Sequence, residues 1–258
     1  MLTAGIDCGA KNTKTVILKD GKIIAKGMNL TGFDQVAAIK ASLEAALNVA
    51  GIKEDDLDHI GGTGSGAAEI KQADVQVNDI KATAKAANYF FPSSRTVTDV
   101  GAEEGRAVKI DDHGTVIDFA INEKCAAGAG AFIEAMSRAL EVPLVEMGSL
   151  ALSSDKTIPM NAQCAIFAES EVVGLIHAKT EKQDISKAIH DAMASRIVSM
   201  IRRIGVNPDI AMIGGVGRNP GFVHSLKSEL EVDTIYIPED PEFGAAVGAA
   251  IVAAEEGK

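Results

Sequence analysis

The sequence is poor in cysteine and aromatic residues and has no cluster of positive charge. Its 258 residues include three cysteines, two tyrosines and no tryptophan, and the net charge is −11. A nucleic-acid surface needs clustered lysine and arginine, so we expect no nucleic-acid partner. Three cysteines, none spaced as Cys-x-x-Cys, cannot form a secreted disulfide framework. Any metal site must therefore be assembled in three dimensions, and it could draw on more than one chain.

Long apolar runs are absent as well. The longest run of small residues, 244–254, is too short to span a bilayer, so no membrane association is expected. The N-terminus enters a strand-like segment without the basic and apolar regions of a signal peptide, which favours a cytoplasmic location. Apolar residues nevertheless make up 47% of the chain, enough to fill the cores of two compact lobes.

The first chemical signal is a polar turn between two predicted strands near the N-terminus. Asp7 ends the first strand, and Asp20-Gly21 predicts a tight hairpin into a third. Glycine lets backbone N–H groups approach phosphate oxygens, and a carboxylate at a strand end can hold Mg²⁺ through its waters. The candidate phosphate contacts are Gly9, Lys11, Asn12, Thr13 and Lys14. An ordinary solvated hairpin is the alternative interpretation.

The same plan occurs a second time. Asp99-Val100-Gly101 repeats the order of strand, Asp-x-Gly, polar turn and strand. A third glycine turn follows a buried strand-like run and precedes a predicted helix, where glycine would let the backbone lie close to a flat ligand. That turn is Gly214-Gly215-Val216-Gly217. In this order the three signals resemble the actin, Hsp70 and sugar-kinase superfamily, which implies an α/β ATPase fold with two duplicated lobes around a nucleotide cleft.

This resemblance assigns roles to the motif residues. Asp7 and Asp99 would hold Mg²⁺ and orient water, with Glu104 as a further catalytic carboxylate. Gly101 and Ala102 would join the first hairpin in contacting phosphates, and the turn at 214–217 would cradle adenosine. The expected lobes are residues 1–92 plus 239–258, and residues 93–238.

The segments between these motifs show the periodicity of helices. Amphipathic helices are predicted over residues 33–50, 79–91, 132–141, 165–179 and 184–205. Pro92 ends the second of them. The run Gly61-Gly62-Thr63-Gly64-Ser65-Gly66 lacks the full dinucleotide-binding spacing, so we predict a strand-end loop that lines the cleft.

Two cysteines stand where irregular segments turn into helices. Cys125 lies in a stretch rich in glycine and alanine, and Cys164 precedes the helix predicted from residue 165. Helix-end N–H groups and the helix dipole would stabilise a thiolate or an anionic iron–sulfur cluster there. Cys8 is predicted to be a small apolar strand residue, and His190 a packed or hydrogen-bonded helix residue.

Four stretches together carry a more specific resemblance. They are 122–130 with Cys125, 164–171 with Cys164, Ala188-Ile189-His190 with Ala194-Ser195-Arg196, and Gly214-Gly215-Val216. They are similar to the family that contains ATP-binding subunits of benzoyl-CoA reductase and activators of 2-hydroxyacyl-CoA dehydratases. The resemblance implies one [4Fe-4S] cluster per dimer, held at a two-fold interface by Cys125, Cys164 and two partner cysteines. It also implies ferredoxin as electron donor, ATP and Mg²⁺ as cofactors, and a catalytic reductase or dehydratase as partner.

The second hairpin departs from one pattern of that family. The dehydratase activators and one type of benzoyl-CoA reductase subunit resemble each other in having Gly-Gly-Gln-Asp at this hairpin. Here the sequence is Gly101-Ala102-Glu103-Glu104-Gly105-Arg106-Ala107. It looks like the other benzoyl-CoA reductase subunit type, so we expect an ATP-dependent oxidoreductase component that pairs with a sibling subunit. The alternatives are a homodimeric dehydratase activator and a small-molecule kinase of the same fold. An actin-like or chaperone-like module is disfavoured because the chain has no room for a peptide-binding domain.

Overall fold

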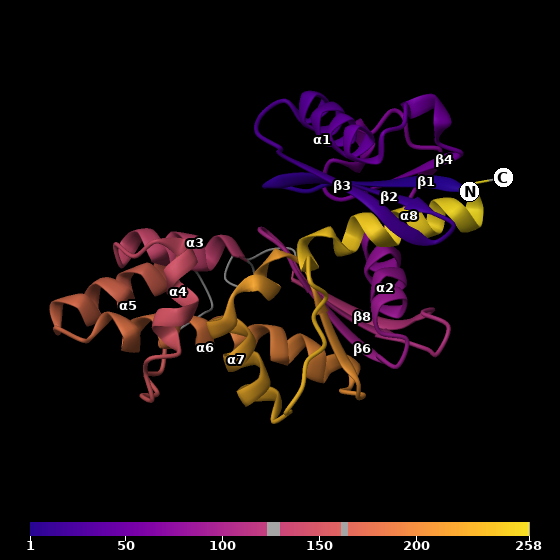
Figure 1. Cartoon of the computed structure of the whole chain (residues 1–258). Coiled ribbons are helices and arrows are strands. Elements are labelled where there is room, and N and C mark those ends of the chain that lie inside the picture. The colour runs from indigo at the N-terminus through magenta and orange to yellow at the C-terminus, as the bar shows by residue number, and fades with distance from the viewer. Residues whose placement is uncertain (123–129, 161–164, 258) are drawn as a thin grey trace.

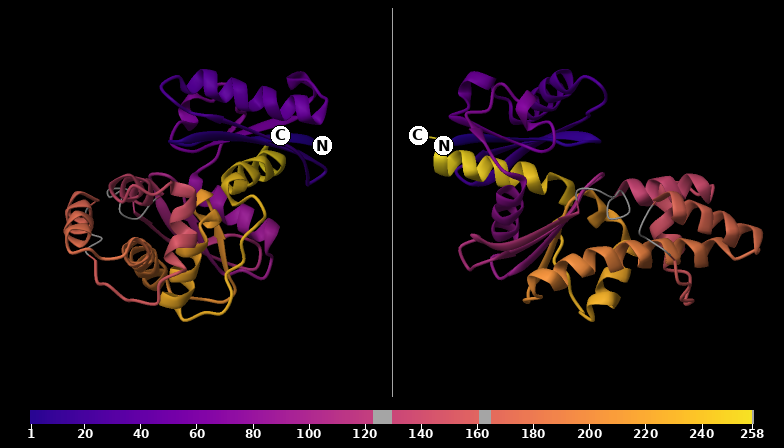
Figure 2. Two further views of the ribbon diagram at one scale, coloured as in Figure 1. Left: turned by 60° about the vertical axis from the view of Figure 1, so that its left-hand side comes forward. Right: turned by 180° about the vertical axis from the view of Figure 1, so that it is seen from behind.

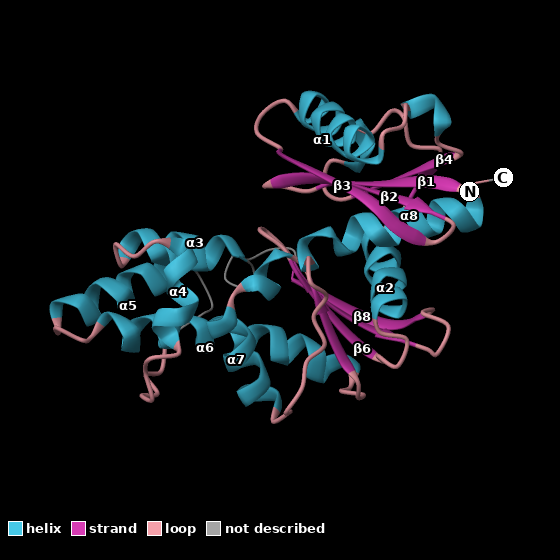
Figure 3. Ribbon diagram, in the orientation of Figure 1, coloured by secondary structure: helices cyan, strands magenta, loops and turns pink. Residues whose placement is uncertain are grey.

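The computed structural model describes residues 1–122, 130–160 and 165–257. It contains two β-sheets, and helices cover both faces of each (Figure 1). The strands form two separate fans, and helices fill the space between and beyond them (Figure 3). This is the mixed α/β arrangement that the alternating strand and helix patterns predict.

The first sheet contains five strands in the order β3-β2-β1-β4-β5. Strand β1 runs antiparallel to β2 and parallel to β4. Helix α1 (Gln35–Ala50) packs on one face, and α8 (Gly244–Glu256) packs on the other. The strands are β1 Leu2–Cys8, β2 Asn12–Lys19, β3 Lys22–Leu30, β4 His59–Thr63 and β5 Val75–Gln76.

The second sheet repeats this plan with four strands in the order β8-β7-β6-β9. Helix α2 (Asp79–Phe90) packs on one face and the long α6 (Lys182–Ile204) on the other. Helices α2 and α8 also touch each other so closely that a Cβ at Gly248 would lie 1.9 Å from the carbonyl oxygen of Ala82. The strands are β6 Thr96–Val100, β7 Gly105–Ile110, β8 Val116–Asn122 and β9 Ile210–Ile213.

The register of the strands demonstrates the duplication. In the first sheet Asp7 stands opposite Lys14 across β1 and β2. In the second, Asp99 stands opposite Arg106 across β6 and β7. Strands β4 and β9 then lie parallel to β1 and β6, respectively. The predicted actin-, Hsp70- and sugar-kinase-like fold is therefore confirmed, and each half presents an aspartate at an equivalent position.

A helical layer extends from the second sheet, away from the chain termini (Figure 2). Its core is formed by large buried side chains that include Phe132, Met136, Met193 and Phe222. Within the described ranges, every helix is either too short or too polar to pass through a lipid bilayer. The helices are α3 Gly130–Ala139, α4 Leu144–Ala151, α5 Ala165–His177 and α7 Pro220–Leu230, and the short 3₁₀ turns are η1 Glu54–Asp56, η2 Ala67–Glu69, η4 Gly215–Arg218 and η5 Pro241–Phe243.

All five predicted helices are confirmed to within two residues at each end. The prediction omitted α8, and it omitted α4, whose eight residues are too few to show a clear helical period. The lobe boundaries remain a prediction. They place α2 in the first lobe, whereas α2 packs against α8 and against the second sheet as well.

Candidate functional site

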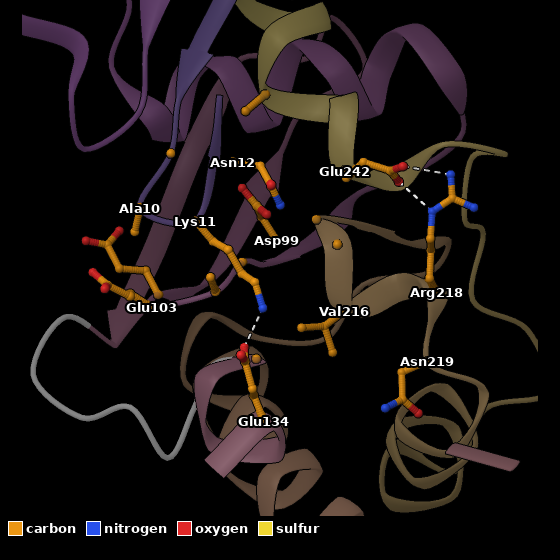
Figure 4. Close-up of a pocket in the computed structure, with 18 of the residues that line it drawn as sticks. Ala10, Lys11, Asn12, Asp99, Glu103, Glu134, Val216, Arg218, Asn219 and Glu242 are labelled. Carbon is orange, nitrogen blue, oxygen red and sulfur yellow. Dashed lines mark hydrogen bonds and ion pairs between the residues drawn. The ribbon is translucent and has the colours of Figure 1, made fainter. Parts of the chain in front are cut away.

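A cavity of about 460 Å³ opens between the two sheets. It is lined by both Asp-x-Gly hairpins, by the glycine turn after β9, and by parts of α3 and α4 (Figure 4). Its size is in the range of small-ligand sites. The predicted site residues that line it are Asp7, Gly9, Lys11, Asn12, Lys14, Asp99, Gly101, Ala102, Glu104, Gly214, Gly215 and Val216.

Two predicted contacts do not line the cavity. The Thr13 side chain is fully buried on the opposite face of β2, where its hydroxyl lies 3.0 Å from that of Thr31. Successive strand residues point to opposite faces, so Thr13 cannot face the cavity when Lys14 does. Gly217 packs against Pro241 and Ile237 instead. The structure therefore does not bring Thr13 and Gly217 to the cavity, and their predicted ligand contacts stay predictions.

The first hairpin supplies a buried ion pair. Lys14 Nζ donates to Asp7 Oδ2 at 2.9 Å, and Asp7 is only 7% exposed. Burial raises the pKa of Asp7, Lys14 opposes that shift, and the nearby Asp99 and Asp79 add to it. A further cation bound in the cavity would stabilise the charged form of this carboxylate.

The second hairpin supplies a larger charged cluster around Arg106. Its guanidinium donates to Asp99 Oδ2 at 3.1 Å, to Asp79 Oδ2 at 2.9 Å, and to Glu104. Burial lowers the pKa of Arg106, but the three carboxylates outweigh burial and hold it above its usual value. Arg106 is thus bound by three carboxylates, whereas its equivalent in the first half, Lys14, has one carboxylate partner among the residues that the structure describes. The two equivalent aspartates are therefore paired with different cations, a lysine in the first half and an arginine in the second.

Asp79 is a site residue that the sequence interpretation missed. It begins α2 and lines the cavity. Its Oδ1 accepts from the Thr63 hydroxyl at 2.7 Å and from Gly64 N–H at 2.8 Å, so it ties the loop after β4 to Arg106. The Asn78-Asp79 helix start was a visible signal, but it does not reveal that this helix end faces the cavity. The predicted cleft-lining loop is confirmed, since Gly64 and Ser65 line the cavity.

The glycines that follow β4 and β9 occupy equivalent positions in the two halves. Gly64 has a φ of +92° and Gly214 a φ of +89°. A Cβ at Gly64 would lie 2.4 Å from Asp7 Oδ1, and one at Gly214 would lie 2.5 Å from Asp99 Oδ1. Each turn therefore needs glycine for its backbone conformation and for its close approach to the aspartate.

Gly214→Ala is expected to lower the free energy of unfolding by about 3 kcal/mol, because it combines a strained φ with a steric clash. The added Cβ would meet Val100 O at 2.4 Å. Gly21→Ala is the matched control, since Gly21 also has a positive φ but no atom within 4 Å of its Cβ position. That change should cost about 1 kcal/mol. Equal losses in chemical denaturation would show that the contact with Val100 does not matter.

The cavity is also lined by uncharged side chains. They include Val216 of the glycine turn, Leu144 and Val145 of α4, and Asn219 and Pro220. At the rim, Arg218 makes a two-pronged ion pair with Glu242, at 2.8 and 2.7 Å (Figure 4). The cavity therefore combines the charged hairpins with apolar and amide side chains of the kind that can contact a flat ring.

Helix α3 joins the two hairpins. Gly130 N–H donates to Gly101 O at 2.9 Å, and Ala131 N–H donates to Ala102 O at 2.8 Å. From the other hairpin, Lys11 Nζ reaches Glu134 at 2.5 Å across the cavity (Figure 4). The first turns of α3 are thus in direct contact with both predicted phosphate-binding hairpins.

The two predicted cluster ligands, Cys125 and Cys164, lie outside the described residues. The described chain resumes after them at α3 and α5, and these two helices pack against each other. Cys8 is fully buried in the first core, so its predicted packing role is confirmed. His190 is also buried and hydrogen-bonded, as predicted. No group of three His, Cys, Asp or Glu side chains in the described ranges is placed to hold a metal ion.

Known structures agree with this architecture. The chain superimposes with a TM-score of 0.93 on the activator of 2-hydroxyisocaproyl-CoA dehydratase from Clostridium difficile, a structure with bound ADPNP. The two are 33% identical, and the match covers 99% of this chain and 95% of the other. A glucokinase of the ROK family from Streptomyces griseus, 14% identical with a TM-score of 0.60, shares the fold alone.

Sequence comparison gives the same relationship. The chain is 38% identical to the activator of lactoyl-CoA dehydratase from Anaerotignum propionicum, over 99% of this chain and 98% of the other. It is 27% identical to a benzoyl-CoA reductase subunit from Thauera aromatica, over 97% and 92%. The hairpin at 101–107 alone had favoured a reductase component. Similarity over the whole chain instead favours the alternative, a dehydratase activator. A family model matches residues 4–253, so the chain belongs to the BadF/BadG/BcrA/BcrD ATPase family.

Proposed function

We propose that this protein is the activating ATPase of a 2-hydroxyacyl-CoA dehydratase. It would bind Mg-ATP in the cavity and couple hydrolysis to delivery of one electron to a catalytic partner. The observation that carries the proposal is the pair of equivalent hairpins, which place Asp7 and Asp99 in one cavity between two sheets. A dehydratase is proposed as the catalytic partner because similar proteins are named as dehydratase activators.

The charged hairpins of the cavity suit the phosphates. Lys11, Asn12 and Lys14 offer side-chain donors, and Gly9, Gly101 and Ala102 offer backbone near the same space. Magnesium would be held by Asp7 and Asp99 through water, since Mg²⁺ commonly binds with one or two carboxylates and the substrate phosphates. Glu104 is bound to Arg106, so in this conformation it acts by holding that arginine. Adenosine would lie against Gly214, Gly215 and Val216.

The iron–sulfur cluster is assigned to Cys125 and Cys164 with two cysteines of a second subunit. Four thiolates are the usual ligand set of a [4Fe-4S] cluster, and the cluster would supply a low-potential electron received from a ferredoxin. Helix α5, which follows Cys164, exposes Phe167, Val173 and Ile176, with Phe167 63% exposed. Such a surface suits a two-fold contact with a second copy of the chain.

Coupling between the two sites would run through α3. This helix follows the segment that contains Cys125, and its first turns bond to Gly101, Ala102 and Lys11. A change in the hairpins when the γ-phosphate leaves would therefore pull directly on the start of α3. The same contacts would let a change beside Cys125 reach the nucleotide.

Anaerobic purification of the full chain tests the proposal. We expect a brown homodimer with about four iron atoms per dimer, ATP hydrolysis, and activation of a 2-hydroxyacyl-CoA dehydratase. A colourless protein that phosphorylates a sugar would instead support the kinase alternative and overturn the proposal.

A component of benzoyl-CoA reductase is the second candidate, favoured by the hairpin Gly101 to Ala107. It predicts that the chain alone stays largely without iron. Co-expression with a sibling subunit that has the Gly-Gly-Gln-Asp hairpin would then give a one-to-one complex with one cluster. The iron content of the chain expressed alone and with the sibling separates the two candidates.

A further inference from the structure

His190 is a fully buried titratable residue that plays no part in the phosphate chemistry. Its Nδ1 lies 2.7 Å from the carbonyl oxygen of Ser186, one turn earlier on α6. A carbonyl oxygen only accepts, so Nδ1 carries the proton. Burial lowers the pKa of His190, although its bonds to Ser186 and Asn219 oppose the shift. This shift favours the neutral ring, in which Nε2 is an acceptor.

The acceptor Nε2 fixes the orientation of Asn219. Its partner is Asn219 Nδ2 at 3.0 Å, so the amide must turn its NH₂ group toward the histidine. A second bond agrees, because Phe222 N–H donates to Asn219 Oδ1 at 3.1 Å and thereby caps α7. Helix α4 closes the third side, since a Cβ at Gly148 would lie 2.4 Å from Asn219 Oδ1.

Asn219 also lines the cavity, on the far side of Val216 from Asp99 (Figure 4). An amide NH₂ group has two donor hydrogens. Within the described part of the chain, His190 is the one hydrogen-bond partner of Asn219 Nδ2. The second hydrogen is thus available to a ligand, and the carbonyl end is occupied by the cap of α7.

We propose that His190 is a positioning residue that locks the Asn219 amide so that it donates a hydrogen bond to the base of the bound nucleotide. This inference rests on the proposed ATP site and adds the group that recognises the base. The ligand chemistry is a purine with a ring-nitrogen acceptor. Lys11 and Lys14 would hold the phosphates at the first hairpin.

The test compares ATP with inorganic tripolyphosphate, which has no base, by calorimetry on the full-length protein. Asn219→Asp and Asn219→Ser both keep an oxygen that can cap α7, but they lack the N–H donors. We expect each to weaken ATP binding about tenfold and to leave tripolyphosphate binding unchanged. The serine variant adds no charge, and Asn48→Asp on the exposed face of α1 controls for added charge elsewhere.

The histidine is tested by His190→Phe, which fills the space without an acceptor. It should also weaken ATP and spare tripolyphosphate, and in hydrolysis assays it should raise KM with little change in kcat. Wild-type ATP affinity in both Asn219 variants would overturn the proposal. An equal loss of affinity for ATP and for tripolyphosphate would overturn it as well, because such a loss indicates general structural damage. If the wild type binds neither compound, the proposed ATP site itself fails, and the inference fails with it.

Discussion

ATP hydrolysis is expected to fall about a hundredfold when either Asp7 or Asp99 is replaced by asparagine. Each carboxylate lies at a hairpin in the cavity, and each is less than 10% exposed. Asparagine keeps the shape but removes the negative charge that would be directed at Mg²⁺ and at the attacking water. The loss should appear in kcat measured at saturating Mg-ATP by phosphate release.

The structure indicates that Asp99→Asn will fold, because the buried arginine beside Asp99 has other carboxylate partners. In Asp99→Asn, Arg106 keeps Asp79 and Glu104 as partners. Asp34→Asn is a suitable control, because Asp34 caps α1 outside the cavity and asparagine caps equally well. Wild-type hydrolysis in both hairpin variants would mean that the hairpins are scaffold only.

Serine at either Cys125 or Cys164 is expected to abolish the iron–sulfur cluster. A cluster that needs four thiolates cannot form when each subunit of a dimer supplies one. Nucleotide affinity should remain within about threefold of wild type, because the proposed nucleotide contacts come from the two hairpins and the glycine turn after β9. Iron and sulfide analysis of anaerobically purified protein measures the first effect, and calorimetry with ADP measures the second.

Cys8 provides the matched control for the cysteine experiment. It is fully buried against apolar neighbours, so Cys8→Ala should retain the cluster and cost only a small amount of packing. A full cluster in either serine variant would overturn the ligand assignment. Loss of the cluster in Cys8→Ala with an intact fold would overturn it as well.

Local sequence was sufficient for the elements that have a strong period or a specific turn. The helix over residues 35–50 has an aspartate cap at Asp34 and a left-handed Gly51 at its end, and both are visible in the sequence. The two hairpins were also predictable from the sequence. In each, an aspartate and a glycine with the spacing Asp-x-Gly accompany a strand-like run. The eight-residue α4 gave no such signal.

Site residues were predicted well where they lie within a motif and poorly where they do not. Lys14 and Thr13 are adjacent, and only the observed strand register shows which of the two faces the cavity. Asp79 and Asn219 begin helices, and a helix start in a sequence does not reveal what it faces. The assignment to a reductase rested on seven residues, whereas similarity over the whole chain favours the dehydratase activators.

The sequence by itself determined the duplicated α/β fold, the two aspartate hairpins and the order in which they occur, because these depend on local periodicity and on turn chemistry. Only the tertiary structure decided that Arg106 is held by three carboxylates while its equivalent Lys14 has one among the described residues, and that His190 fixes the orientation of Asn219. These contacts join residues up to 29 positions apart in the chain. Their geometry depends on how sheets and helices pack, and no local pattern in the sequence encodes it.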